Sequence, residues 1–434
     1  MKIILKYILM IIVLTGLFLG ALLAVSFIPK DDIKKHAKES AIIMIAEGEK
    51  KSVETLSKHL YTENSTDAIM VNLSYTIDPD NKLESVIKAR RNYLPGITTE
   101  VKSDIVGDLP HESSEYLMTN ELFETVNNKK QVSYEYTRYW HGYIVILRIL
   151  LMFFNIFEIR LITQVIFFAL IGLLMYYLKK NSNWKIAISL LFSFIAVNLF
   201  VWHTALQGAF VIIIALIISI FSANKKINEK NMCFWLFISG ALTAYLDFLT
   251  IPIVTALLPI LTYTAVNVSE TNVKTEFITF IKRMTSWGVG YLGLWVAKWI
   301  LADLIYDMGI IRISIEQIFY RIGTKHNVQF FGIAALVRNL DNHINYLVTI
   351  IYLFLLLYSI FKIKKYEKGY FWNSQKIPYY LSAITPIAWF LIVADHSYFH
   401  FFFTYKAFLI TILAIMCIVF DDRNGKYLKI KNKE

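Results

Sequence analysis

Long apolar segments alternate along this chain with polar connections, most of them short. The first apolar segment runs from Ile3 to Phe27 and has Lys2 and Lys6 at its start. It exceeds the ~20 residues that a helix needs to cross the hydrocarbon core of a bilayer. It ends in Ile28-Pro29-Lys30, without the small-residue pattern of a signal-peptide cleavage site. We therefore predict a retained membrane anchor whose N-terminus is cytosolic.

The next segment, residues 30–138, is hydrophilic, carries charges of both signs and is slightly acidic. Long domains cross membranes largely regardless of their charge, so we place this segment outside the cell. Its pattern is mainly helical. One apolar stripe predicts a helix that ends at Gly48, with the members Ile33, Ala37, Ala41 and Met44. Thr66 is expected to cap a second helix, which carries Ile69, Met70 and Leu73.

The apolar run from Tyr143 to Leu178 is too long for one crossing, and Asn155 interrupts it. We predict an interfacial or re-entrant helix over 142–154 and a span over 156–178. Eight further spans are expected at about 186–202, 205–222, 232–249, 251–267, 286–306, 345–361, 378–394 and 402–420.

Basic residues concentrate in alternate connections, as the positive-inside rule requires of cytosolic loops. These clusters are Lys179, Lys180 and Lys185, then Lys225, Lys226 and Lys230, then Lys274, Lys282 and Arg283, then Lys362, Lys364, Lys365 and Lys368, and finally the tail after residue 420. Ten spans with both termini in the cytoplasm satisfy every cluster. The expected units are an anchor (1–28), an extracytoplasmic helical domain (29–140), a polytopic membrane domain (141–420) and a basic tail (421–434).

One connection, residues 307–344, departs from that rule. It is placed outside, yet it carries Arg312, Arg321, Lys325 and Arg338. Either two spans are miscounted here, or these cations have a task on the outer face, such as holding phosphate.

Composition agrees with a membrane protein. Of the 434 residues, 56% are hydrophobic and 18% are charged, and the mean hydropathy is +0.50. Soluble domains average about 45–50% apolar and about 25% charged residues. We therefore predict an all-α polytopic protein of the cell membrane.

The net charge of +11 follows the basic connections, so it does not indicate nucleic acid as a partner. Cys233 and Cys417 both lie in predicted spans, which makes a disulfide or a thiolate metal site unexpected. Walker, dinucleotide-binding and HExxH motifs are absent from the sequence, so no nucleotide cofactor is expected, and a divalent metal is left open. Any chemistry must then use an activated, lipid-borne substrate or a gradient.

With this topology, most of the unusual polar residues fall on the outer side. They are Asp31, Asp32, Asp67, Arg138, His141, His203, Asp247, Lys298, Asp303, His396 and His400. Ionisable groups at membrane depth are costly and tend to face a cavity and a partner. Asp31, Asp32 and Asp67 are candidate general bases for a sugar hydroxyl. The alternative for all three is a favourable acidic position at the start of a helix.

Residues 136–143, with the sequence YTRYWHGY, form the densest cluster of aromatic and basic side chains in the chain. Its aromatic rings fit the belt at a membrane boundary. Arg138, Trp140 and His141 together also fit a pyrophosphate or a sugar. Arg148 and Arg160, with Glu158 as a partner, either hold a lipid phosphate or extend to the headgroups.

Two further groups are candidates for substrate binding. Asp247 and Lys298 either bind substrate or form a structural ion pair. His396 and His400 are four residues apart and share one helical face, followed by Lys406. Without the glutamate of an HExxH motif a metal site is not expected there, and phosphate or hydroxyl contacts fit as well.

A retained first span, a large helical first outer loop with acidic residues and many further spans resemble the GT-C superfamily of integral-membrane glycosyltransferases. Four segments also resemble membrane proteins of Gram-positive bacteria that have no established substrate: residues 66–70 (TDAIM), Arg138 to Tyr143, residues 247–250 (DFLT), and His396 to Lys406. The GT-C resemblance implies a polyprenyl-linked sugar donor and a catalytic carboxylate in the first outer loop, here Asp31, Asp32 or Asp67.

The resemblance therefore implies an inverting glycosyltransferase on the outer face, which moves sugar from a polyprenyl-phosphate donor to a cell-envelope glycan or lipid acceptor. Two other classes stay open. A transporter or lipid flippase would use the same polar groups to carry a solute, and an envelope assembly protein would use its outer domain for docking without catalysis.

Overall fold

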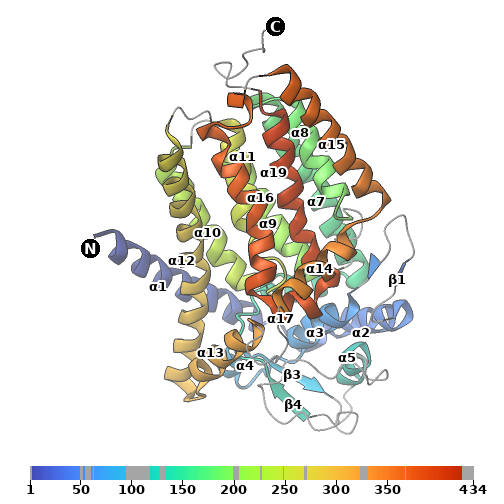
Figure 1. Cartoon of the computed structure of the whole chain (residues 1–434). Helices are drawn as coiled ribbons and strands as arrows, with labels where there is room; N and C mark the ends of the chain where they lie inside the picture. The colour runs from blue at the N-terminus through green and yellow to red at the C-terminus, as the bar shows by residue number, and fades with distance from the viewer. Residues whose placement is uncertain are drawn as a thin grey trace.

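The computed structural model is mainly helical and has two parts, a helical bundle and a smaller domain at one end of it (Figure 1). We call the smaller domain the cap. The structure describes residues 2–48, 52–53, 60–61, 63–93, 118–127, 132–198, 205–224, 227–247, 249–267, 271–322, 331–366 and 368–422.

The structure has a helix at each of the ten predicted positions. These are α1 (Lys2–Ser26), α7 (Ile156–Asn181), α8 (Trp184–Ile195), α9 (Leu206–Ser222), α10 (Glu229–Leu246), α11 (Val254–Val266), α12 (Val273–Tyr306), α15 (Tyr346–Lys365), α16 (Ile377–Ile392), and α18 (Phe401–Thr404) continued by α19 (Phe408–Phe420). Within the described residues, five segments are long and apolar enough to cross a membrane: α1, α7, α12, α15 and the one that contains α19. The chain is thus suited to a membrane, while the ten-span topology stays a prediction.

The pair α10 and α12 has an especially close contact, which two glycines permit. A Cβ atom on Gly240 would lie 2.1 Å from the Trp287 carbonyl oxygen, and one on Gly290 would lie 2.1 Å from that of Phe237. Small residues at such crossings let the backbones of two membrane helices approach. Any side chain at either position would push α10 and α12 apart.

The cap contains α2 (Lys30–Glu47), α3 (Asn64–Tyr75), α4 (Lys82–Lys88) and α5 (Met118–Val126). The predicted stripe of α2 is fully buried, and the helix ends at Gly48 with a φ of 81°, so that prediction is confirmed. The prediction for Thr66 was wrong, because α3 begins at Asn64 with Glu63 as its N-cap residue.

Four short strands complete the cap and were not predicted. The strand β1 (Ser52–Val53) pairs with β2 (Leu60–Tyr61), and β3 (Arg90–Tyr93) pairs antiparallel with β4 (Val132–Glu135). In the second pair Arg90 lies opposite Glu135. These strands are too short to show a periodic pattern in the sequence.

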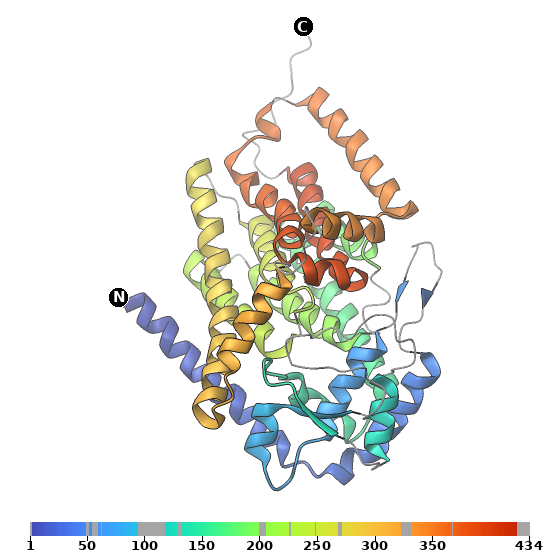
Figure 2. The same ribbon diagram turned by 60° about the horizontal axis from the view of Figure 1, so that its bottom comes forward.

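The predicted break at Asn155 is present, between α6 (Tyr143–Leu151) and α7. The side chain of Asn155 accepts hydrogen bonds from the backbone of Phe157 and Glu158, and the Asn155 backbone N–H donates to the Glu158 carboxylate. Glu158 is therefore half of a capping box rather than a partner of the arginines. Three short helices, α13 (Ile310–Arg321), α14 (Phe331–His343) and α17 (Ala394–Phe399), lie at the same end of the bundle as the cap (Figure 1). Figure 2 turns this end of the molecule forward.

Predicted cytosolic ends of several helices meet at the opposite end of the bundle. Lys185 and Lys362 both pair with Asp422, at 2.8 and 3.1 Å, and Arg283 pairs with Glu229 at 2.6 Å. The bundle therefore has basic clusters at one end and the cap at the other (Figure 1).

Candidate functional site

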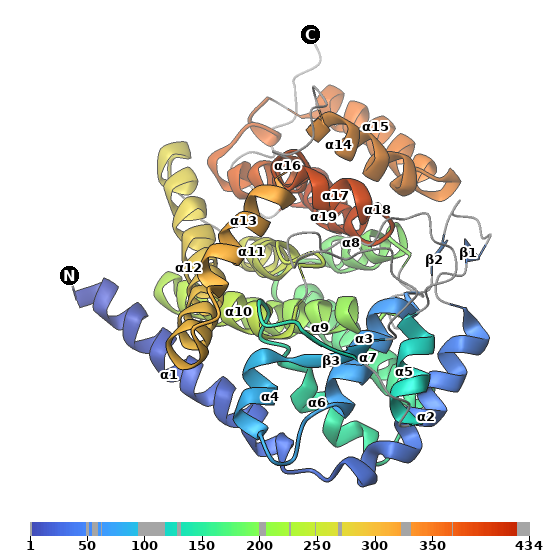
Figure 3. The same ribbon diagram turned by 90° about the horizontal axis from the view of Figure 1, so that it is seen from below.

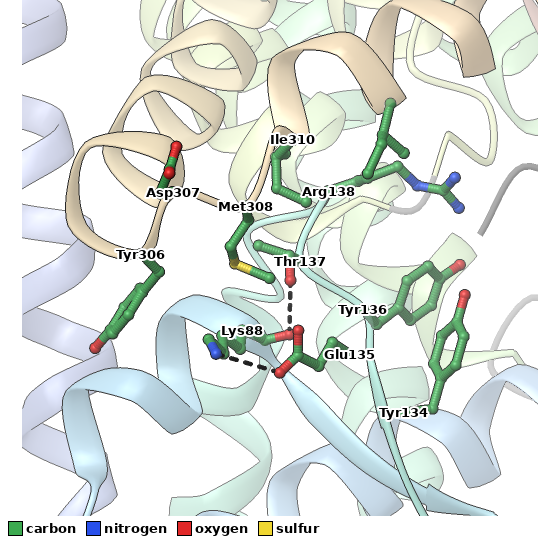
Figure 4. A pocket seen from close by; sticks show the side chains of 11 residues that line it. Lys88, Tyr134, Glu135, Tyr136, Thr137, Arg138, Tyr306, Asp307, Met308 and Ile310 are labelled. Carbon is green, nitrogen blue, oxygen red and sulfur yellow. Dashed lines mark hydrogen bonds and ion pairs between the residues drawn. The ribbon is translucent and has the colours of Figure 1, made fainter. Parts of the chain in front are cut away.

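A cleft of about 290 Å³ lies where the cap meets the turn between α12 and α13 (Figure 4). It is lined by Lys88, Tyr134, Glu135, Tyr136, Thr137, Arg138, Tyr306, Asp307, Met308, Ile310 and Ile313. This volume is at the lower limit for small-molecule pockets and matches a group of about the size of one sugar. Three tyrosines among the lining residues offer apolar ring faces with a polar edge.

The charged groups of the cleft come from paired strands and the end of α4. Lys88 lies 2.9 Å from Glu84 and 3.4 Å from Glu135, and Arg90 lies 3.2 Å from Glu135. The hydrogen bond that Lys88 donates to Glu84 raises the pKa of Lys88, so this amine stays charged. The cleft thus carries a fixed cation beside a carboxylate, both of which are partly exposed.

The segment 136–142 contributes Tyr136, Thr137 and Arg138 to this cleft and is fixed on both sides. On the cap side, the Thr137 hydroxyl donates to the Lys88 carbonyl at 3.1 Å. On the bundle side, the Trp140 indole donates to the Leu294 carbonyl at 2.7 Å, and the Trp299 indole donates to the Arg138 carbonyl at 3.0 Å. The backbone of this segment is therefore rigid, and the side chain of Arg138 is presented from a fixed point.

A second group of polar side chains adjoins that segment, and we call it the polar cluster. It consists of Arg138, Tyr139, Asp247, Arg321, His396 and His400. The charges of Arg138, Asp247 and Arg321 all act on Tyr139, and that of Arg321 also acts on His396. Four segments that are far apart in the sequence therefore converge here: the 136–142 segment, the turn after α10, the end of α13, and α17.

The two histidines of the cluster are adjacent, as their spacing predicted. Their ring centroids are 4.7 Å apart, and His400 stacks on Phe403 at 5.3 Å. Nε2 of His400 lies 3.4 Å from a guanidinium nitrogen of Arg321, so it accepts from that arginine. The ring of His396 is buried, and the backbone of Leu249 lies beside it.

Asp247 supplies a carboxylate to the cluster. It follows α10 and accepts the backbone N–H of Thr250 at 2.9 and 3.0 Å, which closes a turn. Leu249 within this turn has a φ of 69°, a left-handed conformation that is costly for a branched side chain. The carboxylate is 3% exposed and its charge also acts on Tyr291 of α12.

Burial controls the protonation of the cluster. It raises the pKa of Tyr139 to about 12, so this phenol keeps its proton and can donate it in a hydrogen bond. Burial, and then the charge of Arg321, lowers the pKa of His396 well below its usual value, so its ring is neutral. The cluster therefore combines two permanent cations with neutral donors and acceptors and one carboxylate, which suits a phosphate ester beside a hydroxyl.

Other candidate residues from the sequence have contacts that favour the structural alternative. Asp67 is fully buried, accepts the Leu206 N–H at 2.9 Å and pairs with Arg160 at 2.7 Å. Arg160 also donates to Glu47 and Asn64. This network joins α7 to the cap and leaves neither residue free for a substrate.

Arg148 is also internal. Its guanidinium donates to the backbone carbonyls of Val25, Ile28 and Ser74, and so fixes the junction between α1 and α2. These contacts hold the Arg148 guanidinium inside the protein, so it does not extend to lipid headgroups. None of the three contacts is to a residue of the polar cluster.

Three more candidates hold the 136–142 segment and α4 in place. Trp140 is 1% exposed and donates to Leu294, and His141 contacts the Tyr143 hydroxyl and the Tyr136 carbonyl, each at 2.7 Å. The predicted pair of Lys298 with Asp247 does not form. Lys298 instead donates to the Ile87 carbonyl at 2.6 Å, at the end of α4.

The remaining candidates lie elsewhere. Asp31 and Asp32 are exposed in the first turn of α2, and Figure 3 shows the junction of α1 and α2 far from α13 and α17. Lys406, on η4 (Tyr405–Ala407), is buried, and the charge of Glu63 in the cap acts on it. His203 lies outside the described residues, and Asp303 caps the start of α13 by accepting the N–H groups of Ile310 and Ile311.

The structure thus brings together Arg138, Asp247, His396 and His400 from the sequence candidates, and adds Tyr139 and Arg321. Arg321 had a signal in the sequence, because it belongs to the connection that breaks the positive-inside rule. The residues Lys88, Tyr134 and Glu135 had none, since only the pairing of β3 with β4 and the position of α4 bring them to the cleft. Comparison of the chain with known protein families, curated proteins and solved structures found no match.

Proposed function

We propose that this chain is a multi-pass plasma-membrane glycosyltransferase with both termini in the cytoplasm and the cap on the outer face. In this proposal it moves a sugar from a polyprenyl-phosphate donor to an acceptor of the cell envelope. The single observation that carries the proposal is the convergence of Arg138, Arg321 and the two histidines beside Asp247, next to a cleft the size of a sugar.

The proposed orientation rests on where the charges lie. Basic residues at the end of the bundle away from the cap form ion pairs with Asp422 and Glu229. Cytosolic loops are enriched in lysine and arginine, which places that end inside and the cap outside. Lipid-linked sugars presented on the outer face would then reach the polar cluster from the membrane.

In the proposed reaction the Asp247 carboxylate takes the proton of an acceptor hydroxyl. The hydroxyl oxygen forms a bond to the anomeric carbon of the donor as the bond from that carbon to the phosphate oxygen breaks. Polyprenyl phosphate leaves with the bonding electrons, and Arg138 and Arg321 stabilise its charge. The configuration at the anomeric carbon is inverted. Asp31 and Asp32 stay as alternative bases on the sequence resemblance alone.

Native mass spectrometry of the purified protein with a mixture of polyprenyl-phosphate sugars tests the binding step. Selective retention of one lipid-linked sugar, lost in Arg138→Ala and Arg321→Ala, supports the proposal. Lys274→Ala is the control, because it removes the same charge from an exposed position at the other end of α12. Retention that is equal in all four proteins would contradict the assigned site.

A further inference from the structure

The helix α13 has its polar and apolar faces reversed relative to a helix of a soluble protein. Ser314 and Gln317 are buried, while Ile315 is 46% and Phe319 is 56% exposed. The exposed apolar residues repeat every three or four positions and form one stripe: Ile311, Ile315, Ile318, Phe319 and Ile322. In water this stripe would expose a large hydrophobic patch.

The buried face of α13 faces the interior of the protein. Arg321 lies one turn after the buried Gln317 and reaches His400 beside α17. Polar side chains of α13 therefore face the polar cluster, and the apolar stripe faces away from it. Figure 3 shows α13 crossing from the end of α12 towards α17.

The helix α14 repeats this reversal. Asn339 is fully buried, donates to the Ser397 carbonyl at 2.7 Å and accepts the Thr404 hydroxyl at 2.7 Å. On the outside, Ile333 is 52% and Val337 is 57% exposed. Two neighbouring short helices thus share an arrangement with polar groups inside and apolar groups outside.

The apolar stripes continue the surfaces of adjoining long helices. The last turns of α12 expose Leu304 and Ile305, at 80% and 42%. A tight turn follows, with left-handed Asp307 and Gly309, and α13 starts at once. At its other end, α14 leads into α15, whose first residues Tyr346 and Leu347 are 80% and 38% exposed. The stripes therefore begin at the depth where two of the long apolar helices end.

We propose that α13 and α14 lie in the plane of the membrane, in the leaflet on the cap side, with their apolar stripes covered by phospholipid acyl chains. Continuity with α12 and α15 favours lipid over a protein partner, because the same surface that faces acyl chains on α12 runs on into α13. Amphipathic helices bind the interface between headgroups and chains in this way.

The cations of this connection fit the same position. Arg312 is exposed beside the stripe of α13, and Arg338 of α14 lies over the rings of Tyr398 and Phe401, at 4.5 and 4.2 Å. At the depth of the headgroups an exposed arginine is close to lipid phosphates. The positive charge of this connection therefore follows from its position in the leaflet.

The test measures depth and needs no substrate, so it is independent of the proposed transferase activity. The full chain, with Cys233→Ala and Cys417→Ala, is placed in nanodiscs of phosphatidylcholine with brominated acyl chains. A fluorophore is attached through Ile315→Cys, Phe319→Cys or Val337→Cys. The reference for lipid is Leu292→Cys, on the exposed apolar side of α12, and the reference for water is Asn81→Cys, exposed in the cap.

We expect labels on both short helices to be quenched by brominated lipid as strongly as the label at Leu292, and to be protected from iodide. Quenching by iodide, as at Asn81, would show that the stripes face water and would overturn the proposal. Protection from both quenchers would show that a protein surface covers them, and would overturn it as well.

Discussion

The carboxylate of Asp67 and the guanidinium of Arg160 are joined by two hydrogen bonds, of 2.7 and 3.1 Å, where the cap meets α7. Both side chains are buried, and the Asp67 carboxylate also accepts a hydrogen bond from the backbone N–H of Leu206. One of the three acidic residues that the GT-C resemblance implies as a candidate base thus joins two parts of the protein.

Removing one partner of this pair leaves the other as an uncompensated buried charge. We expect Arg160→Met to lower the free energy of unfolding by about 3 kcal/mol. The change is measured by denaturant unfolding of the purified protein in detergent. Glu47→Gln is the control, because this carboxylate also pairs with Arg160 but is 35% exposed and should cost less than about 1 kcal/mol. Equal losses in the two variants would contradict the assigned role.

Arg148 fixes the junction between α1 and α2 through three backbone carbonyls. A lysine keeps the charge but lacks the planar set of donors, so it cannot bond all three. We expect Arg148→Lys to cost at least about 2 kcal/mol, since buried carbonyls lose their partners. Arg138→Lys, whose side chain is partly exposed, should leave the unfolding curve unchanged. A stable Arg148→Lys protein would show that the contacts to Val25, Ile28 and Ser74 contribute little.

Buried His141 should make the protein less stable in acid. Burial lowers the pKa of His141 to about 3, against an ordinary value of 6.5. Between these values the unfolded chain binds a proton that the native protein does not, so stability is lost as pH falls below 6.5. This histidine alone should cost about 2 kcal/mol between pH 7 and pH 5.

His141→Asn tests that assignment, because asparagine accepts the left-handed backbone of this position, where φ is 55°. We expect a smaller loss of stability between pH 7 and pH 5 in the variant than in the wild type. His396, whose pKa is also lowered by burial, keeps a part of the acid dependence in both proteins. An unchanged pH profile would contradict the role of His141.

Lys298 connects α12 to the cap. Its amine lies at the end of α4, where helix carbonyls lack partners and a cation is favourable. We expect Lys298→Met to increase hydrogen exchange in α4 by more than tenfold, while exchange in α5 stays the same. If exchange rose equally in both helices, the effect would be general destabilisation rather than the loss of this contact.

The sequence predicted the helices well where a period or a strong cap was present. The stripe of α2, the end at Gly48 and the break at Asn155 are all local signals, and the structure confirms them. The sequence did not predict β3 and β4, because their pairing joins residues that are far apart in the chain and leaves no local pattern.

The predictions for the candidate site were also correct where the signal is local and not where it depends on distant segments. The spacing of His396 and His400 correctly predicted that the two rings are adjacent. The roles of Asp67, Arg148 and Lys298 could not be read from residue type, because buried charged groups occur both in binding sites and in structural networks. Only the partners decide between these two roles, and for all three residues the partners come from distant segments.

In the proposed function, Asp247 acts as a base in sugar transfer beside a phosphate site. The direct measurement is release of polyprenyl phosphate by the protein in proteoliposomes that contain polyprenyl-phosphate sugars and envelope acceptors. We predict release matched by glycosylated acceptor, and a fall in kcat of ~10²–10⁴-fold in Asp247→Asn with donor binding retained. Asp32→Asn, exposed and far from the cluster, should keep the wild-type rate. Full activity of Asp247→Asn, or movement of the intact lipid-linked sugar across the membrane without release of phosphate, would contradict the claim.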